Sequence, residues 1–436
     1  MFSLGDADMD TEFIPKTKDP FRISKLMYII EALLEYYISI LVTGTYLAKL
    51  TTTIGISDST TALLSSIATF SGMFQLVSIY LAQRTPLKRW LIPMSVLTQL
   101  LFASVYLIPL IGGGFDPSWL FFFIILIANA LKTIASPIKY TWFTSLVEER
   151  RRGAYASVLT MVSIIGSMIF TVAISAIIDY YDRTGNINGA FSCLAIIIIF
   201  TAVLHTATLI ISKENRNAQK VKPVSPFRSI GELMHNKRYV RLLILYVMIS
   251  FSSCFVTPFL STYLLNELAF SLTFISVIDV VIGICQVFFL YFAGRYSMRH
   301  SYITLRHVSI IFQTVSMLAV VFMKGGLAVP MYIFYRLTAA ATGATASVSA
   351  STMLFSVAAP EHRTAAISLN TIIIGTLSFF MTLLATPLVN YVQKNGMSVF
   401  GIEIYAQQLL ALISVFLAIP VFIYYHVFCK KQFKDI

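Results

Sequence analysis

The chain is a succession of long apolar segments separated by short polar joins. A helix needs about 20 apolar residues to cross a membrane, because each residue advances it by ~1.5 Å through about 30 Å of hydrocarbon. The apolar runs predict an all-α polytopic membrane protein. We expect twelve membrane-spanning helices, at about 26–48, 60–82, 91–111, 119–145, 154–178, 190–211, 242–265, 270–293, 303–323, 327–357, 365–389 and 403–427.

The order of the segments indicates an internal duplication, with six spans, one long polar stretch and six further spans. Three short landmarks recur in the same order in both parts: Thr45–Leu47 and Thr262–Leu264, Tyr80–Arg84 and Tyr291–Arg295, and Arg152 and Arg363. Each match is weak alone, but together with the topology they favour a parallel repeat. We therefore expect 12 transmembrane helices in two pseudo-symmetric six-helix bundles.

This organisation predicts five segments along the chain. The first tail is acidic at its start and basic at its end, and the linker and the second tail are rich in Lys and Arg. The linker is expected to include a short amphipathic helix around 227–234. The expected boundaries are a cytoplasmic tail at 1–25, an N-terminal six-helix half at 26–211, a cytoplasmic linker at 212–241, a C-terminal six-helix half at 242–427 and a second tail at 428–436.

The composition agrees with this class, since 57% of the residues are hydrophobic, 12% are charged and the net charge is +12. A soluble domain carries roughly 25% charged residues. All but seven of the 32 Lys and Arg fall in the tails and joins of one side. The exceptions are Lys49, Arg183, Lys324 and Lys394 on the other side and Lys132, Lys139 and Arg336 within spans. This bias predicts a plasma-membrane protein with both termini cytoplasmic, and a basic charge that faces anionic lipid rather than nucleic acid.

The charged turn after the fourth span, Leu146–Gly153, and its counterpart Pro360–Thr364 are similar to turns of the major facilitator superfamily. The resemblance covers the whole span region. The loop after the second span, Gln83–Arg89, lacks the Asp of the family signature, and the drug-antiporter signature of the fifth span is absent. The resemblance implies a monomeric transporter for a small molecule. It also implies alternating access, in which two halves rock about a central site lined chiefly by spans 1, 4, 7 and 10.

Four charged residues inside the first half are the first candidates for a binding site. Glu31 and Glu35 are one helical turn apart on span 1, and Lys132 and Lys139 share a face of span 4. Counted from the membrane surface, Glu31 matches Lys139 in depth and Glu35 matches Lys132. We expect two Glu–Lys pairs or one four-membered network that binds substrate or protons. The alternative is a static network that fixes the packing of the two spans.

The second half offers a smaller set. Asp279 in span 8 and Arg336 in span 10 match in depth and predict a salt bridge with a coupling or gating role. Asn129 lies one turn from Lys132 and is added to the candidate substrate or proton site. His205, late in span 6, is interpreted as a hydrogen-bonded structural histidine.

The function that these features favour is secondary active transport of a small organic solute, with protons as the expected coupling ion. A P-loop is absent from the sequence, as are H-E-x-x-H, a Cys/His cluster and a C-x-x-C spacing, so we expect no enzyme activity, cofactor or metal. A serine-like motif at Ser57 is explained by helix capping. The alternatives are efflux of drugs or metabolites without a dedicated substrate, a non-transporting membrane sensor and a polytopic membrane enzyme.

Overall fold

The computed structural model describes residues 20–82, 87–111, 116–147, 152–214, 226–297, 299–359, 362–399 and 402–433. Most of the charged turn after the fourth span, and Pro360 and Glu361 of its counterpart, lie outside these ranges. The first bundle is formed by α1 (Arg22–Leu41), α2 (Gly44–Thr53), α3 (Asp58–Phe70), η1 (Ser71–Phe74), α4 (Gln75–Ala82), α5 (Lys88–Val105), η2 (Ile108–Leu110), α6 (Ser118–Leu146), α7 (Arg152–Arg183) and α8 (Ile187–Ile211).

The second bundle follows the short helix α9 (Pro226–His235). A small antiparallel hairpin pairs Ser398 with Glu403 and Val399 with Ile402 before the last long helix. The elements are α10 (Lys237–Cys254), η5 (Thr257–Phe259), α11 (Leu260–Thr262), η6 (Tyr263–Glu267), α12 (Leu272–Ser297), α13 (Tyr302–Val321), η7 (Gly325–Leu327), α14 (Ala328–Val357), α15 (Arg363–Asn395), β1 (Ser398–Val399), β2 (Ile402–Glu403), α16 (Ala406–Tyr424) and η9 (Tyr425–Cys429).

The predicted spans are confirmed as helices, with ends displaced by a few residues. Within the described ranges, ten helices are long and apolar enough to cross a membrane. Two further helices, α5 and α14, run beside them, α5 against α6 and α8 and α14 against α12 and α13. The first is short and begins with Lys88 and Arg89, and the second is rich in Ala, Ser and Thr, which lowers its hydropathy.

Spans 1 and 7 are both broken near their middle. Thr43 is extended and Gly44 has a φ of +56°, so α1 ends before α2 begins. A side chain at position 44 would be strained in this left-handed conformation. In span 7, Pro258 lies in the 3-10 turn η5 between α10 and α11. The repeated landmarks Thr45–Leu47 and Thr262–Leu264 follow these two breaks, and α2 packs against α11 and η6.

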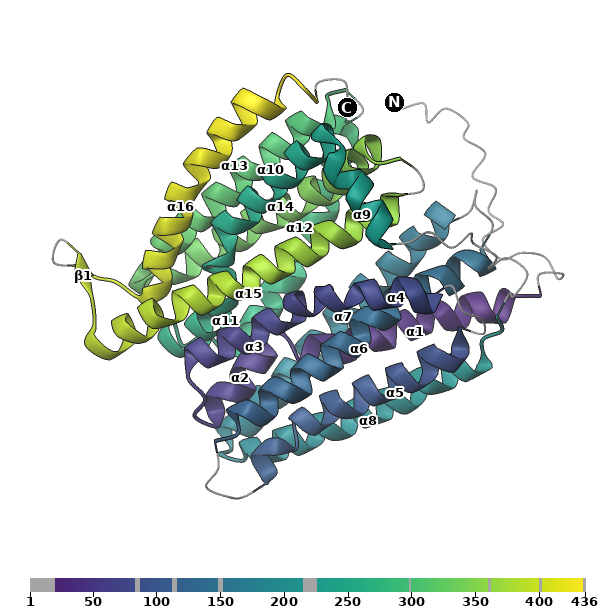
Figure 1. The fold of residues 1–436 in the computed structure, drawn as a ribbon. Coiled ribbons are helices and arrows are strands. Elements are labelled where there is room, and N and C mark those ends of the chain that lie inside the picture. Colours follow the sequence, from purple (N-terminus) through teal and green to yellow (C-terminus); the bar gives the residue numbers. More distant parts are fainter. Residues whose placement is uncertain are drawn as a thin grey trace, which may run out of the picture.

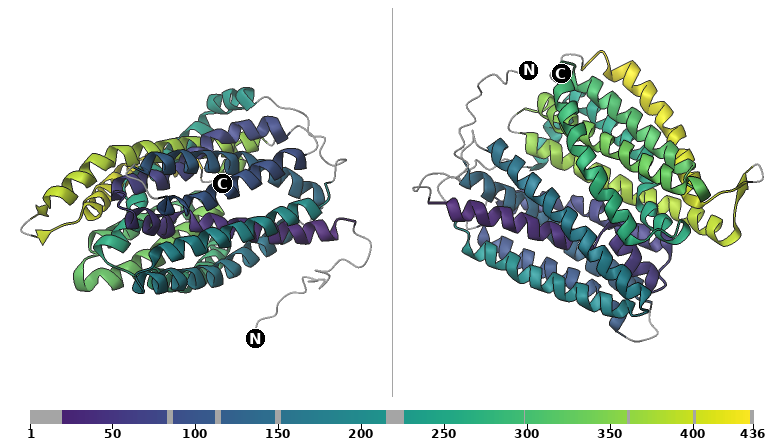
Figure 2. Two further views of the ribbon diagram at one scale, coloured as in Figure 1. Left: turned by 90° about the horizontal axis from the view of Figure 1, so that it is seen from below. Right: turned by 180° about the vertical axis from the view of Figure 1, so that it is seen from behind.

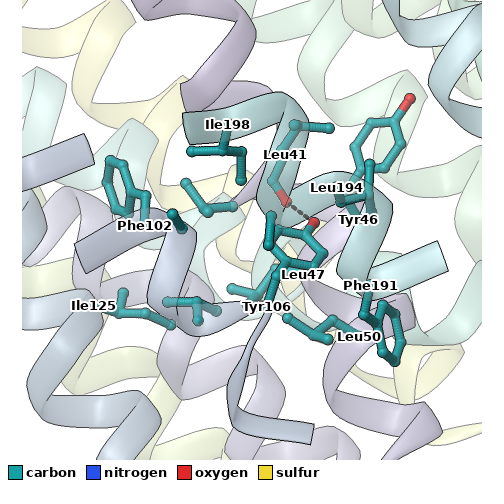
Figure 3. Close-up of a cluster of buried hydrophobic side chains, with 14 of the residues drawn as sticks. Leu41, Tyr46, Leu47, Leu50, Phe102, Tyr106, Ile125, Phe191, Leu194 and Ile198 are labelled. Carbon is teal, nitrogen blue, oxygen red and sulfur yellow. Dashed lines mark hydrogen bonds between the residues drawn. The ribbon is translucent and has the colours of Figure 1, made fainter. Parts of the chain in front are cut away.

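The break in span 1 is covered by a buried apolar cluster (Figure 3). The hydroxyl of Tyr106 donates to the carbonyl of Leu41, at 2.5 Å, where α1 ends. Tyr106 is 1% exposed. A carbonyl at a helix end has lost its intrahelical partner, and the Tyr106 hydroxyl supplies a replacement inside the cluster.

Replacing Tyr106 with phenylalanine is expected to lower the free energy of unfolding by about 1–3 kcal/mol, because the Leu41 carbonyl is left buried without a donor. Chemical denaturation of the purified protein in detergent measures the change. Tyr180, which is 65% exposed, provides the control. Its replacement by phenylalanine should stay within about 0.5 kcal/mol of the wild type. Equal losses in the two variants would show that the hydroxyl of Tyr106 does not stabilise the break.

The two bundles are closest where α2, α3, α11 and α15 meet and diverge toward the end at which α1 begins and α16 ends (Figures 1 and 2). The junction is formed mainly by α3 against α15 and by α7 against α12. Gly375 of α15 lies directly against the backbone of Thr69 in α3, so that a Cβ would overlap the Thr69 carbonyl. We call the end at which α2, α3, α11 and α15 meet the junction end of the molecule. The end at which α1 begins and α16 ends is the splayed end.

Helix α9 lies at the splayed end and packs on α10 and α15 of the second bundle (Figure 1). It matches the expected amphipathic helix, with Leu233 buried. Glu232 accepts a hydrogen bond from Arg228 (2.9 Å) and lies 2.6 Å from Nε2 of His362. The Arg228 hydrogen bond, with a smaller contribution from His362, lowers the pKa of Glu232 below its ordinary value. The ionised Glu232 therefore links α9 to the first residues of span 11 at neutral pH.

Candidate functional site

A central cavity of 930 Å³ lies between the two bundles. Its lining comes from α1, α2, α3 and α7 of the first bundle and from spans 7, 8, 10 and 11 of the second. The expectation that spans 1, 7 and 10 line the site is confirmed. The expectation for span 4 is wrong, because α6 supplies none of the described lining residues and instead packs inside the first bundle against α3, α4 and α5.

Asp279 and Arg336 form an ion pair in the wall of this cavity. Arg336 Nη2 of α14 lies 2.5 Å from Asp279 Oδ1 of α12, which confirms the predicted salt bridge. The side chains are 33% exposed for Arg336 and 41% for Asp279, so a solute can reach both. Among the described residues, Nε of Arg336 has no hydrogen-bond partner. This Nε is a buried donor, so it lies unsatisfied within the wall rather than on the cavity surface.

Aromatic and hydroxyl side chains complete the wall around this pair. Tyr332 and Tyr335 of α14 flank Arg336, and Tyr46 of α2 approaches from the first bundle. The Tyr46 hydroxyl is 2.8 Å from Ser175 Oγ, which is 2.5 Å from Ser276 Oγ. A cavity lined by aromatic rings with a few fixed polar groups is typical of sites for small organic ligands.

The four charged residues of the first half form a different site, inside the first bundle and away from the central cavity. Lys139 Nζ donates to Glu31 Oε1 at 2.6 Å and also contacts Glu35 Oε2. His205 Nε2 of α8 lies 2.8 Å from the same Glu31 oxygen. Glu31 and His205 are almost fully buried, at 2% and 0% exposure, whereas the Glu35 side chain is 30% exposed. The group joins α1, α6 and α8, and the hydrogen bonds and ion pairs described for it all stay within the first bundle.

The predicted pairing is confirmed for Glu31 with Lys139 and wrong for Glu35 with Lys132. Lys132 Nζ donates instead to Ser39 Oγ, at 2.6 Å. Ser39 lies one turn after Glu35 on α1. Because α1 and α6 run antiparallel, Ser39 and not Glu35 lies at the same depth as Lys132. The long side chain of Lys139 reaches both acids, which are only one turn apart.

Asn129 does not belong to either site. Its side-chain amide donates to the Ile125 carbonyl of its own helix, at 2.8 Å, and the residue is 6% exposed. It is not among the described lining residues of the central cavity. A side-chain amide that donates to a carbonyl of the preceding helical turn has a hydrogen-bond partner within its own helix.

Glu31, Glu35 and His205 offer three ligand atoms within 4.8 Å of one another, which is a spacing that a metal ion could bridge. The Lys139 ammonium already contacts both carboxylates. A dication would have to displace this lysine before it could bind there. In the structure the Lys139 ammonium neutralises both carboxylates, so they do not need a metal ion as their counter-charge.

Two features of the sites were missed by the sequence analysis. His205 is a hydrogen-bonded histidine, as interpreted, but its partner Glu31 was not foreseen. The Tyr46–Ser175–Ser276 group across the two bundles was not foreseen either, although the recurrence of the Thr-Tyr-Leu landmark marks Tyr46 as a position that the repeats share.

Comparisons with known proteins agree with this architecture. The family model described as Major Facilitator Superfamily matches residues 27–382. No curated protein sequence matches the chain significantly.

Solved structures show the same fold at low sequence identity. A mutant of the nucleoside transporter NupG is 14% identical, with a TM-score of 0.72 over 93% of this chain and 100% of that chain. A bacterial homologue of the human lysosomal transporter Spinster, inward-facing and unoccupied, is 12% identical, with a TM-score of 0.67 over 96% and 99%. A D-xylose–proton symporter is 15% identical, with a TM-score of 0.64 over 93% and 98%. With most of its length matched by the family model, this multi-pass membrane protein belongs to the Major Facilitator Superfamily of secondary transporters and is not an enzyme.

Proposed function

We propose that this protein moves a small organic solute through the central cavity by alternating access, driven by protons. The observation that carries the proposal is the 930 Å³ cavity between the bundles, with the Asp279–Arg336 pair in its wall. Its volume lies within the range of about 300–1,000 Å³ that small-molecule sites occupy. Protons are the proposed coupling ion because Asp279 in the cavity wall is a partly exposed carboxylate that can take up a proton.

The proposal extends to orientation, membrane and oligomeric state. The positive-inside bias favours cytoplasmic termini, so the splayed end would face the cytoplasm and the junction end the outside. This assignment makes the described conformation inward-facing in the plasma membrane. Each bundle contributes to one cavity within a single chain, which supports a monomer as the transporting unit.

The substrate class is open to a direct screen. The structurally similar transporters carry chemically different cargo, such as nucleosides and D-xylose, and they show the fold alone. Purified protein is screened by thermal shift against nucleosides, sugars, short peptides and organic acids, because a ligand that binds the native state raises its melting temperature. Each binder is then tested for uptake into proteoliposomes with and without an imposed pH gradient. Uptake that a pH gradient accelerates supports the proposal. A binder whose flux ignores the pH gradient excludes proton coupling, and failure of every binder to cross the membrane excludes transport of these classes.

The junction end carries hydrogen bonds that would have to break for the cavity to open to the outside. Asp58, in the first turn of α3, accepts from Asn266 (2.7 Å) and from Gln393 (2.8 Å), both in the second bundle. Asp179 of α7 accepts from the backbone N–H of Thr273 at the start of α12, at 2.8 Å. These bonds favour the closed junction of the proposed inward-facing state.

Replacing Asp58 with alanine is expected to shift the protein about tenfold toward the outward-open state, the equivalent of about 1.4 kcal/mol, because two charge-assisted hydrogen bonds are lost. The native cysteines are replaced and one cysteine is placed at Ser347 in the cavity wall. The readout is the rate at which a membrane-impermeant maleimide, added on the side of the junction end, labels this cysteine. Asp182 provides the matched control, since it pairs with Lys49 inside the first bundle. Asp182→Ala should leave the labelling rate unchanged, and equal rates in all three proteins would contradict the role of Asp58.

A further inference from the structure

A second, much smaller cavity lies inside the first bundle, between α1, α5, α6 and α8. Its polar lining residues are Glu35, Ser39, Ser95, Thr98, Gln99, Lys132 and His205. The volume is 10 Å³, at the lower limit of what one water molecule requires. The cavity is distinct from the central one, since the two share none of their lining residues.

Two buried polar atoms of this lining have no hydrogen-bond partner among the described residues, Oε1 of Gln99 and Nδ1 of His205. Gln99 is 4% exposed and His205 is 0% exposed. The other ring nitrogen of His205 faces the carboxylate of Glu31, which accepts hydrogen bonds only and is paired with Lys139. Nε2 of a neutral His205 must therefore carry the proton, and Nδ1 is left as an acceptor.

The chemistry of the lining matches one water molecule. A water can donate one hydrogen to Nδ1 of His205 and the other to Oε1 of Gln99, while its oxygen can accept from the Lys132 ammonium and, when Glu35 is protonated, from the Glu35 acid O–H as well. A buried water typically makes about three hydrogen bonds to otherwise unsatisfied groups. The water would satisfy both orphaned acceptors, which are destabilising when they are buried without a partner.

The net charge of the groups around this position is zero, so one added proton raises it only to +1. Glu31 and Glu35 of α1 balance Lys132 and Lys139 of α6, so the group is neutral when His205 of α8 is neutral. Helix α5 faces the cavity with uncharged side chains, Ser95, Thr98 and Gln99. The other titratable side chains near the group are phenols, Tyr28 and Tyr155. An imidazolium at His205 would keep its contact with the Glu31 carboxylate.

We propose that one water molecule in this cavity relays a proton from Glu35 to His205, which is thereby the buried proton-binding residue of the first bundle. A proton from solvent first converts the partly exposed Glu35 carboxylate into the acid. The acid O–H then breaks as its proton passes to the water, and the water gives one of its own protons to Nδ1. Glu35 returns to the carboxylate and His205 becomes imidazolium. The use of this proton in transport rests on the proposed function.

The test is nuclear magnetic resonance of the full-length protein, labelled with ¹⁵N at its six histidines and reconstituted in lipid. Loss of one signal in His205→Gln assigns the residue, and His307→Gln serves as the control for a histidine outside the network. We expect Nδ1 of His205 to exchange magnetisation with water and to become protonated as the pH is lowered while the protein stays folded. A His205 that remains neutral and isolated from water throughout this range overturns the proposal.

Two variants separate the relay from a merely structural histidine. Gln99→Leu removes the amide oxygen that accepts from the water without altering the His205–Glu31 contact, and it should abolish both the water contact and the protonation of Nδ1. Glu35→Gln should keep the water contact but slow exchange of the Nδ1 proton with solvent at least about tenfold, because the carboxyl that passes the proton is gone. Unchanged signals in Gln99→Leu, or unchanged exchange in Glu35→Gln, contradict the relay.

Flux measurements distinguish this proposal from the proposed function. If His205 takes up its proton through the water but the solute flux ignores a pH gradient, proton coupling fails and the proton site stands. If the flux is driven by the gradient and His205→Gln keeps the same proton-to-solute ratio, coupling stands and His205 is not its proton carrier.

Discussion

Replacing Lys139 with methionine is expected to lower the free energy of unfolding by about 3–5 kcal/mol, which is the usual cost of removing one partner from a buried ion pair. The ammonium contacts both Glu31 and Glu35, and the Lys139 side chain is only 7% exposed. Without it the Glu31 carboxylate keeps His205 as its single described partner. Methionine has nearly the same length and no charge, so lost packing contributes little.

Two further variants decide whether charge is the cause. Adding Glu31→Gln to Lys139→Met should restore part of the stability, because it removes the uncompensated carboxylate. Lys132→Met is the matched control, since Lys132 lies on the same helix but donates only to Ser39 in the described structure. Its cost should be about 1–2 kcal/mol. Denaturation of the four purified proteins in one detergent gives the comparison, and equal losses for the two lysines would contradict a special role for Lys139.

The helices could be predicted because membrane helices follow one simple rule. The length of an apolar run sets the span, and this rule located every long helix of the structure to within a few residues. The break at Thr43 and Gly44 could not be predicted from the run, because Thr and Gly are tolerated within membrane helices and the apolar residues resume at Tyr46. The structure explains it by a partner distant in sequence, since the Tyr106 hydroxyl satisfies the freed carbonyl at the end of α1.

Depth counting succeeded where one acid faced one base. Asp279 and Arg336 lie at the same level and form the expected pair, because the helical rise fixes how far each residue lies from its helix end. It failed for Glu35 because a lysine side chain spans more than one helical turn of about 5.4 Å, so depth alone does not decide between neighbouring acids.

Depth also says nothing about the rotation of a helix about its own axis. The sequence placed Asn129 and the lysines of α6 on the cavity wall, whereas in the structure both lysines donate to side chains of α1 and Asn129 donates to its own helix. The second partner of Glu31 was hidden for the same reason. His205 belongs to a helix expected at the periphery, and only the packing of α8 against α1 brings its imidazole to the buried carboxylate.

The Asp279–Arg336 pair carries the second large expected effect. Arg336→Met is expected to weaken binding of a solute that contacts the guanidinium about 30-fold or more, because truncating one partner of a charge pair in a site costs about 2–5 kcal/mol. The reason is twofold: the cavity wall loses the positive charge of the guanidinium, and Asp279 is left without its counter-charge. Titration of the strongest binder from the screen by calorimetry measures the change, with Asp182→Asn as the control for an acid outside the cavity.

The companion variant Asp279→Asn identifies the charge of the solute. If the solute carries a carboxylate or phosphate, Asp279→Asn frees the guanidinium, and binding is kept or strengthened while Arg336→Met abolishes it. If the solute is a cation, the order is reversed, because Asp279 is then the group that binds it.

The charge-swapped double variant, Asp279→Arg with Arg336→Asp, distinguishes a role in solute binding from a role in helix packing. A pair that only joins α12 to α14 works equally well in either direction, so recovery of wild-type affinity in the swap would show that the pair holds the helices and does not contact the solute. Continued loss of affinity in a swapped protein of wild-type stability would mean that the solute distinguishes the two charges.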